Sequence, residues 1–406
     1  MTQPFVIHVD AERGFSGGEV QVFHLMRGLR EAGFGQLLVA PPGSLASERA
    51  RAEGFEVQEV AMRNSADLGA ISRLRKVFRS QQASAEHGLI LQLHTGRATW
   101  LGAWAAAGLG VVVVSTRRMD RRVKRGLGTR ILYGKLVDRV VAISGPVREC
   151  LLAGGVDPAK ISLIHSSVIP DELKHADPKQ ARAELRRELN IDEDELVCLV
   201  LAQLHARKGI DVLLLAIERL ANRAGLEALR LRNLRASKSA RRASQTTIHD
   251  ERIAPAKSVR VVIAGDGPER DSLEAQARGL TTQGVVTFLG ARSDKAALLA
   301  MADVVVLPSR QEGLGVAALE AMAAGKAVIA SRVGGLAEAV VEDRTGVFVA
   351  AGDAEALAVA IERLAGDRNL CRRLGAGGRG RVSEGFLVHQ MVGAYTELYA
   401  SLVQKS

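Results

Sequence analysis

The chain alternates short apolar runs with longer segments in which apolar residues recur every three to four positions. The short runs are rich in Val, Ile and Leu, which is typical of β-strands, whereas the longer segments have the period of amphipathic helices. Continuous apolar runs favour strands that are covered on both faces, as in a parallel sheet. Thirteen runs are strand candidates: residues 5–9, 36–40, 56–60, 89–94, 111–115, 139–144, 161–165, 196–202, 259–264, 285–289, 304–307, 327–330 and 347–350. The alternation predicts an α/β protein with two doubly wound parallel-sheet units.

The alternation breaks between residues 170 and 194, where strands stop and a polar, charged stretch intervenes. We therefore place a first domain at residues 1–172 and a second at residues 173–385, sizes that a chain of 406 residues favours. The final helical pattern, residues 386–406, is expected to pack back on the first domain. A basic, Ser-rich stretch at residues 226–258 interrupts the second unit. We interpret it as an insertion that is either partly disordered or a membrane- or partner-binding segment.

The composition is that of an ordinary soluble globular protein, with 47% hydrophobic and 25% charged residues. The longest apolar stretch, residues 100–114, contains glycines and is shorter than the roughly 20 residues that span a bilayer. The chain starts without the basic segment of a signal peptide. Cys150, Cys198 and Cys371 are far apart in apolar patterns, so we expect them to be buried and reduced. These features predict a cytoplasmic protein.

The net charge of +10 is concentrated in two segments. Residues 117–139 hold nine Lys or Arg against two Asp, and residues 230–257 hold eight against two acidic residues. The first segment is either a solvated helix face or a patch that attracts an anionic membrane surface or an acidic glycolipid at the inner face of the membrane. The patch would consist of Arg117, Arg118, Arg121, Arg122, Lys124 and Arg125. Aromatic residues are only 3%, which argues against a nucleic-acid partner.

The segment from Leu307 to Gly325 combines a strand end, a glycine-containing loop and a helix predicted over residues 316–324. Glu312 lies in the loop and Glu320 on the helix, so both carboxylates can address one ligand. The loop glycines allow close backbone approach, and the helix N-terminus presents free N–H groups to an anion such as a diphosphate. On these residues alone, a purely structural strand-loop-helix turn is the alternative.

The spacing of the two glutamates, in this context, resembles that of glycosyltransferase family 4, whose members are retaining enzymes that use nucleotide sugars. Several motifs in one order are far more specific than any one of them. The resemblance implies a fold of the GT-B type, in which two Rossmann-like domains face each other across a cleft. It continues along the chain through residues 15–19, 141–144, 263–268, 288–290, 300–303, 333–338, 343–346 and 352–353.

The resemblance also assigns roles to individual residues. Glu320 would bind the ribose of the nucleotide, Glu312 would contact the donor sugar, and Lys208 would neutralise charge on the leaving diphosphate. Gln203 stands where the family commonly has an Arg, and we expect Arg207 to supply the missing positive charge. The other donor-binding candidates are Gly313, Leu314, Gly315, Val316, Gly265, Gly290 and Arg292.

The first half of the chain offers fewer candidates. Gly17 and Gly18 precede a predicted helix and form either an ordinary turn or a loop for a phosphate or the acceptor. His94 ends a predicted strand and is either a hydrogen-bonded structural residue or a catalytic contact to donor sugar or acceptor. The chain departs from the family at residues 166–167, which are Ser-Ser in place of Asn-Gly, and at residues 116–118, where many members have a His.

We therefore expect a retaining hexosyltransferase that moves a sugar from a nucleotide diphosphate sugar, and we expect a UDP-sugar, to an acceptor hydroxyl in cell-envelope or lipopolysaccharide-core synthesis. No cofactor is expected beyond this donor. The nine histidines form no metal-ligand pattern, so no metal site is predicted. Two alternatives stay open: a nucleotide-sugar epimerase of the same fold, and a non-catalytic nucleotide-sugar-binding protein that docks on membranes.

Overall fold

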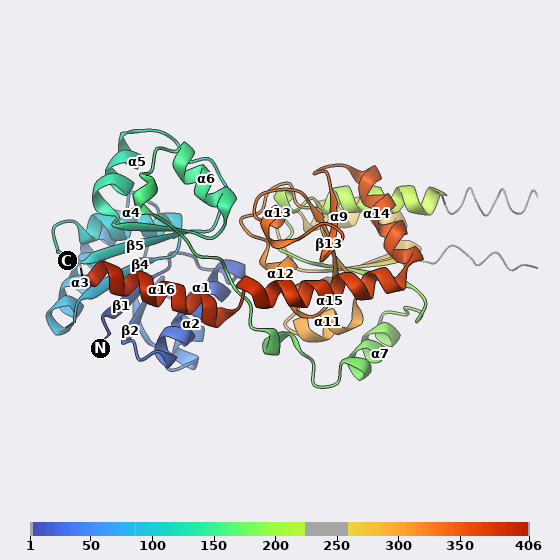
Figure 1. The fold of residues 1–406 in the computed structure, drawn as a ribbon, viewed down its shortest axis with the longest axis horizontal. Helices are drawn as coiled ribbons and strands as arrows, with labels where there is room; N and C mark the ends of the chain where they lie inside the picture. Colours follow the sequence, from blue (N-terminus) through green and yellow to red (C-terminus); the bar gives the residue numbers. More distant parts are fainter. Residues whose placement is uncertain (1–2, 86, 224–258, 405–406) are drawn as a thin grey trace, which may run out of the picture.

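The computed structural model describes residues 3–85, 87–223 and 259–404. Figure 1 shows two lobes side by side along the long axis. Within the described residues, the N-terminal lobe is built on a seven-stranded parallel sheet and the C-terminal lobe on a six-stranded parallel sheet. All thirteen predicted strands are confirmed, with ends that differ by at most two residues. The first sheet contains β1 (Phe5–Val9), β2 (Gln36–Ala40), β3 (Glu56–Glu59), β4 (Leu89–Leu93), β5 (Val112–Arg117), β6 (Arg139–Ala142) and β7 (Ile161–Leu163), and the second contains β8 (Leu196–Leu201), β9 (Val259–Ala264), β10 (Val286–Gly290), β11 (Val304–Leu307), β12 (Ala327–Ser331) and β13 (Gly346–Val349).

Helices cover both faces of each sheet, which buries the Val, Ile and Leu side chains of the strands. Residues 210–223 are also helical, and the predicted insertion at residues 226–258 lies outside the described residues. None of the helices within the described ranges is both long and apolar enough to cross a membrane. The helices are α1 (Gly17–Glu31), α2 (Leu45–Ala52), α3 (Leu68–Ser84), α4 (Gly96–Ala106), α5 (Leu127–Ile131), α6 (Gly145–Ala153), α7 (Pro178–Glu188), α9 (Arg270–Gln276), α10 (Arg278–Thr282), α11 (Lys295–Met301), α12 (Val316–Ala323), α13 (Leu336–Ala339), α14 (Ala354–Gly366), α15 (Arg368–Gly385) and α16 (Val388–Val403).

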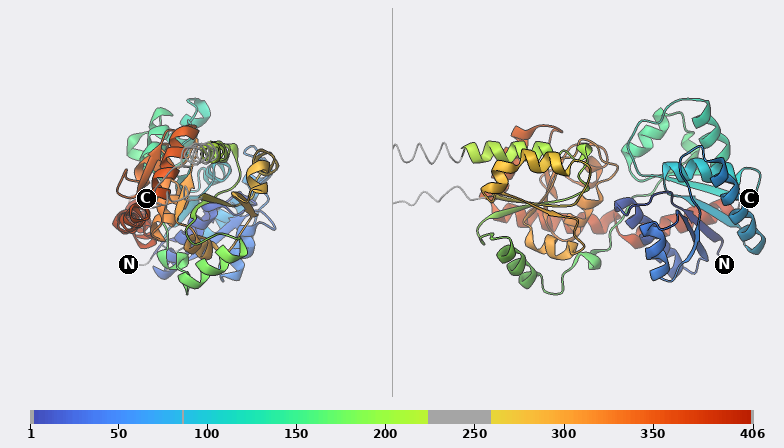
Figure 2. Two further views of the ribbon diagram at one scale, coloured as in Figure 1. Left: turned by 90° about the vertical axis from the view of Figure 1, so that its right-hand side faces the viewer. Right: turned by 180° about the vertical axis from the view of Figure 1, so that it is seen from behind.

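The last helix, α16, leaves the C-terminal lobe and lies against the N-terminal lobe, as the red ribbon in Figures 1 and 2 shows. Its apolar side packs in one buried cluster with Val6 of β1 and Ile90 of β4. Two buried tyrosine hydroxyls add polar contacts, since Tyr395 bonds to Thr116 and Tyr399 donates to Gln92, both at 2.8 Å. The helix therefore links the two lobes.

The cysteines follow the prediction in part. Cys198 and Cys371 are buried and all three thiols are free. The prediction that Cys150 is buried is wrong, because α6 buries only the face that carries Val147 and Leu151, and Cys150 lies beside that face.

The strand order in each sheet fixes where a ligand can bind. In the first sheet the order is β3-β2-β1-β4-β5-β6-β7, so the direction of winding reverses between β1 and β4. In the second sheet, β10-β9-β8-β11-β12-β13, it reverses between β8 and β11. Ligands of open α/β sheets bind beyond the carboxyl ends of the strands at such switch points. The residues there are Asp10 and His94 in the N-terminal lobe, and the loops 202–208 and 308–315 in the C-terminal lobe.

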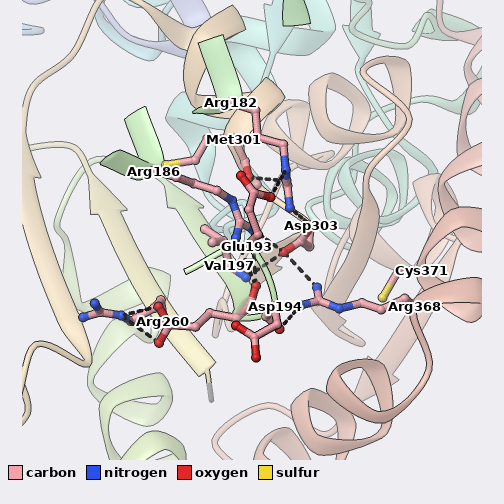
Figure 3. A network of polar contacts seen from close by, with 12 residues as sticks. Arg182, Arg186, Glu193, Asp194, Val197, Arg260, Met301, Asp303, Arg368 and Cys371 are labelled. Carbon is pink, nitrogen blue, oxygen red and sulfur yellow. Dashed lines mark hydrogen bonds and ion pairs between the residues drawn. The ribbon is translucent and has the colours of Figure 1, made fainter. Parts of the chain in front are cut away.

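A partly buried charge network holds the opposite end of the second sheet together (Figure 3). Asp303, directly before β11, receives Arg182 and Arg186 of α7 at 3.0 and 2.9 Å and Arg368 of α15 at 2.9 Å. Burial alone would raise the pKa of Asp303, but the Val197 N–H and the three arginines lower it. The network fastens α7 and α15 to the sheet and leaves the carboxyl ends of the strands free for a site.

Candidate active site

A cleft of about 1020 Å³ lies between the lobes, and both switch points open into it. With one exception, the site residues predicted from the sequence line this cleft. The exception is Gly290, whose carbonyl accepts a hydrogen bond from the Gly265 N–H at 2.7 Å. The lining residues are Gly17, Gly18, His94, Arg207, Lys208, Gly265, Arg292, Glu312, Gly313, Leu314, Gly315, Val316 and Glu320. The fold thus brings candidates from both halves of the chain together.

Glu312 is held by two cations from the loop that follows β8. Lys208 Nζ lies 2.6 Å from Glu312 Oε1, and the Arg207 guanidinium lies 3.3 Å from Glu312 Oε2. The two loops are joined by a hydrogen bond from the Arg310 N–H to the Arg207 carbonyl at 2.7 Å. The side chains of Glu312 and Lys208 are only 8% and 14% exposed, so their attraction is weakly screened by water. The three side chains form one charged unit at the second switch point.

The loop between β11 and α12 depends on two glycines. Gly315 precedes α12 with a φ of +84°, a left-handed conformation that glycine adopts without strain. A Cβ on Gly313 would lie 2.1 Å from the backbone oxygen of Arg118 in the N-terminal lobe, which is too close for any side chain. Glycine at these positions lets the lobes touch and turns the N-terminus of α12 toward the cleft.

Glu320 pairs with a residue that our sequence analysis missed. Lys295 Nζ lies 2.5 Å from Glu320 Oε1, and Lys295 also lines the cleft as the first residue of α11. The two residues are 25 positions apart, and only the fold brings them together. The one hint of Lys295 in the sequence was its closeness to the candidate Arg292. The guanidinium of Arg292 itself donates to the Asp294 carboxylate at 2.5 and 2.7 Å.

In the N-terminal lobe, His94 belongs to a buried chain of hydrogen bonds. Arg118 can only donate, so His94 Nδ1 accepts from it at 3.1 Å. A neutral His94 then donates from Nε2 to His8 Nδ1 at 2.9 Å, and His8 donates from Nε2 to Gln36 at 3.0 Å. Burial lowers the pKa of His8 to about 4 and that of His94 well below its usual value. Both ring nitrogens of His94 are engaged, so its contact to a sugar stays a prediction.

Contacts between the lobes converge on the segments that carry the donor candidates. Ser144 donates from its hydroxyl to the Gly313 carbonyl at 2.6 Å. Glu338 of α13 reaches the N-terminal lobe, where it accepts from the Gly145 N–H at 2.7 Å and lies 2.5 Å from His165 Nε2. Burial alone would raise the pKa of Glu338, but the bonds from His165 and Gly145 lower it. We call these two contacts of Glu338, with His165 and with Gly145, the interlobe latch.

The basic segment after β5 divides into two parts. Arg117 and Arg118 are half-buried and line the cleft, so they face the site instead of the outside. Asp120 lies within this basic segment and was not a predicted site residue. Its side chain hydrogen-bonds to the Gln311 side chain and to the Glu312 backbone across the cleft. Arg121 and Arg122 are exposed at the edge of the same cleft lining, whereas the exposed Lys124, Arg125, Arg130 and Lys135 lie outside it.

Two models of known protein families match the sequence of this chain. The model described as Glycosyltransferase Family 4 matches residues 15–172, and the model described as Glycosyl transferases group 1 matches residues 250–381. Together they cover both lobes.

Similar curated proteins match over part of their length. N-acetyl-alpha-D-glucosaminyl L-malate synthase of Bacillus anthracis is 34% identical over 145 residues, 36% of this chain and 38% of that protein. The lipopolysaccharide core biosynthesis glycosyltransferase LpsE of Rhizobium meliloti is 36% identical over 151 residues, 37% of this chain and 44% of that protein. The match to these two relatives spans less than half of their own length.

Solved structures resemble the whole chain. HepE of Anabaena, solved in complex with UDP-glucose, has a TM-score of 0.78 over 98% of this chain and 100% of that chain, at 18% identity. This likeness confirms the predicted GT-B fold with its two Rossmann-like lobes.

Proposed function

Because the chain belongs to glycosyltransferase family 4, we propose that it is a retaining hexosyltransferase that moves a sugar from a UDP-sugar to an acceptor hydroxyl. The observation that carries this proposal is the charged unit of Glu312, Lys208 and Arg207, which faces the N-terminal lobe across one cleft. The UDP-glucose complex of the Anabaena neighbour supports UDP as the nucleotide. The Rhizobium relative supports a role in cell-envelope or lipopolysaccharide-core synthesis.

In the proposed reaction the donor lies against the C-terminal lobe. Glu320 binds the ribose, Glu312 contacts the sugar, and the backbone of Gly315 and Val316 approaches the diphosphate. The acceptor hydroxyl bonds to the anomeric carbon as the bond from that carbon to the diphosphate breaks, and the hydroxyl proton passes to a diphosphate oxygen. Lys208 and Arg207 stabilise the charge that grows on the leaving diphosphate, where fixed charges are most valuable.

A thermal-shift comparison of UDP-, GDP- and ADP-sugars tests the donor site. A ligand that binds only the folded state raises the melting temperature, so we expect a rise with UDP-glucose in the wild-type protein. The rise should disappear in Glu320→Ala. It should persist in Glu355→Ala, because Glu355 is an exposed residue of α14. No rise with any nucleotide sugar, or an unchanged rise in Glu320→Ala, would sink the proposal.

Turnover is tested by UDP release from UDP-glucose with lipooligosaccharide as acceptor. An acceptor-dependent release with an α-configured product, assigned by NMR, is expected for transfer with retention. An inverted product would contradict the retaining mechanism, and conversion of the donor without UDP release would favour an epimerase.

We further propose that the protein associates peripherally with anionic membranes through Arg121, Arg122, Lys124 and Arg125. These side chains are exposed, and Leu127 beside them is 74% exposed. Each basic residue near an anionic surface contributes about 1 kcal/mol. Flotation with phosphatidylglycerol vesicles should be lost in Arg121→Glu/Arg122→Glu and kept in Arg148→Glu, which reverses the charge of a partly exposed arginine on α6.

A further inference from the structure

Asp10 directly follows β1, at the switch point of the N-terminal lobe, and lies on the wall of the cleft. Its side chain is almost completely buried, and the whole residue is 1% exposed. Asp10 Oδ1 accepts a hydrogen bond from the Glu12 N–H at 2.9 Å. Asp10 Oδ2 is buried and has no hydrogen-bond partner among the described residues. Buried carboxylate oxygens without a partner are rare in folded proteins, because each one costs free energy.

The polar side chains near Asp10 form their hydrogen bonds with other groups. Glu19 of α1 accepts from the Ser16 N–H at 2.6 Å as part of a capping box. Arg118 donates to His94, and His94 donates onward to His8. The polar groups around the switch point thus hydrogen-bond to one another, and Asp10 Oδ2 is left without a partner among them. This is the opposite of the C-terminal lobe, where both cleft glutamates are paired.

We infer that Asp10 binds the acceptor, and that its Oδ2 forms a hydrogen bond with an acceptor hydroxyl beside the reacting centre. The inference rests on the proposed function, and it names an acceptor contact that the sequence motifs do not contain. A carboxyl at the carboxyl end of β1 faces the donor lobe across the cleft, where an acceptor must lie to meet the sugar. A hydroxyl both donates and accepts, so it can satisfy either protonation state of Asp10.

The charge state of Asp10 supports this role. Burial and the nearby Glu19 raise its pKa to about 7, and the Glu12 N–H and Arg118 oppose them. Glu12 on the same loop adds to the rise, and the neutral His94 follows the adjacent strand. The folded protein therefore holds the proton up to about pH 7, whereas the unfolded chain releases it near pH 4. Stability from this group is lost as the pH rises through that window.

Asp10→Asn tests the inference, because Asn keeps the shape and can still accept from the Glu12 N–H. We expect the UDP-induced rise in melting temperature to be unchanged, and hydrolysis of UDP-glucose by water to stay within twofold of wild type. Transfer to octyl glucoside and to lipooligosaccharide should fall at least tenfold, mainly through a higher acceptor KM. Asp171→Asn makes the same substitution at an exposed position of the N-terminal lobe outside the cleft lining, and all rates should change less than twofold.

A thermal measurement without any acceptor tests whether the role of Asp10 is only structural. The melting temperature of Asp10→Asn should gain on wild type between pH 5 and pH 8, because Asn has no proton to lose. A lower melting temperature at both pH values would show a structural role and overturn the inference, as would unchanged transfer rates. Failure of the proposed function is seen separately, as the absence of any UDP shift in the wild-type protein, and it overturns both.

Discussion

In the C-terminal lobe, beyond β8 and β11, each cleft glutamate forms an ion pair. Glu312 pairs with Lys208 and Arg207, and Glu320 pairs with Lys295. Beyond β1 and β4, the groups are of another kind. His8 and His94 are stacked with ring centroids 5.2 Å apart, neutral and fully buried, and Asp10 keeps one oxygen without a partner in the described chain. The same strand order thus supports two switch points with different electrostatics.

Under the proposed function, the difference follows from what each half of the cleft would bind. A diphosphate carries its own negative charge, so a donor site needs fixed cations that are already in place, and ion pairs with the glutamates position them. An acceptor hydroxyl is neutral, so it needs a single group that can exchange a hydrogen bond. On this proposal, charged pairs mark the half of the cleft that would bind the donor, and one unpaired carboxyl marks the half that would bind the acceptor.

Lys208→Met should have the largest effect on this contrast. The loss of one fixed charge at a developing anion lowers turnover by about 100- to 1000-fold, so we expect kcat for UDP release to fall within that range. Affinity for UDP should weaken much less, because ribose and backbone contacts remain. Initial rates and thermal shifts with UDP measure the two quantities.

The pairing of Lys208 with Glu312 gives this experiment an internal check. Lys208→Met leaves a buried carboxylate without its closest cation, which lowers stability, and adding Glu312→Gln should restore the melting temperature but not turnover. Lys179→Met removes an exposed lysine of α7 and should leave both properties unchanged. If kcat in Lys208→Met stays within fivefold of wild type, the charged unit is structural only.

His8→Gln sharpens the description of the other half. The pKa of His8 falls to about 4 in the folded protein, whereas an unfolded chain takes up the proton near pH 6.5. Stability from the neutral pair is therefore present above pH 6.5 and is lost as the pH falls toward 4. At pH 5 the loss from His8 alone amounts to about 2 kcal/mol.

Melting temperatures between pH 7.5 and pH 5 measure this loss. Wild type should lose several degrees across the range, and His8→Gln should lose less, although it starts lower because a hydrogen bond to His94 is missing. His389→Gln, which removes an exposed imidazole of α16 outside the cleft, should follow wild type. Parallel pH curves for His8→Gln and wild type would show that the buried pair is not neutral.

The sequence predicts the strands and the two glutamates that line the cleft, because both follow from local sequence patterns. Runs of Val, Ile and Leu mark buried strands, and Glu312 and Glu320 lie on one strand-loop-helix segment. Lys295 and His8 are different. Each of them is recognised only by its contact with a residue on another element, Lys295 with Glu320 and His8 with His94. In the sequence, His8 stands within an apolar strand and looks like a core position. Such contacts depend on strand order, which periodicity does not contain.

The interlobe latch joins the two halves, and Glu338→Gln should have the smallest effect of the three changes. Gln keeps the shape but loses the charge that holds His165 and the Gly145 N–H. A charge-assisted hydrogen bond contributes about 1.5 to 3 kcal/mol, and Gln retains part of it, so we expect kcat/KM for UDP release to fall about five- to tenfold. Small-angle scattering should show a larger radius of gyration, because the lobes separate. Glu342→Gln breaks an exposed ion pair with Arg332 in the same segment and should leave both measurements unchanged. Equal rates in the two variants would mean that the loop between β11 and α12 does not need the N-terminal lobe to hold it, and that the two switch points act independently.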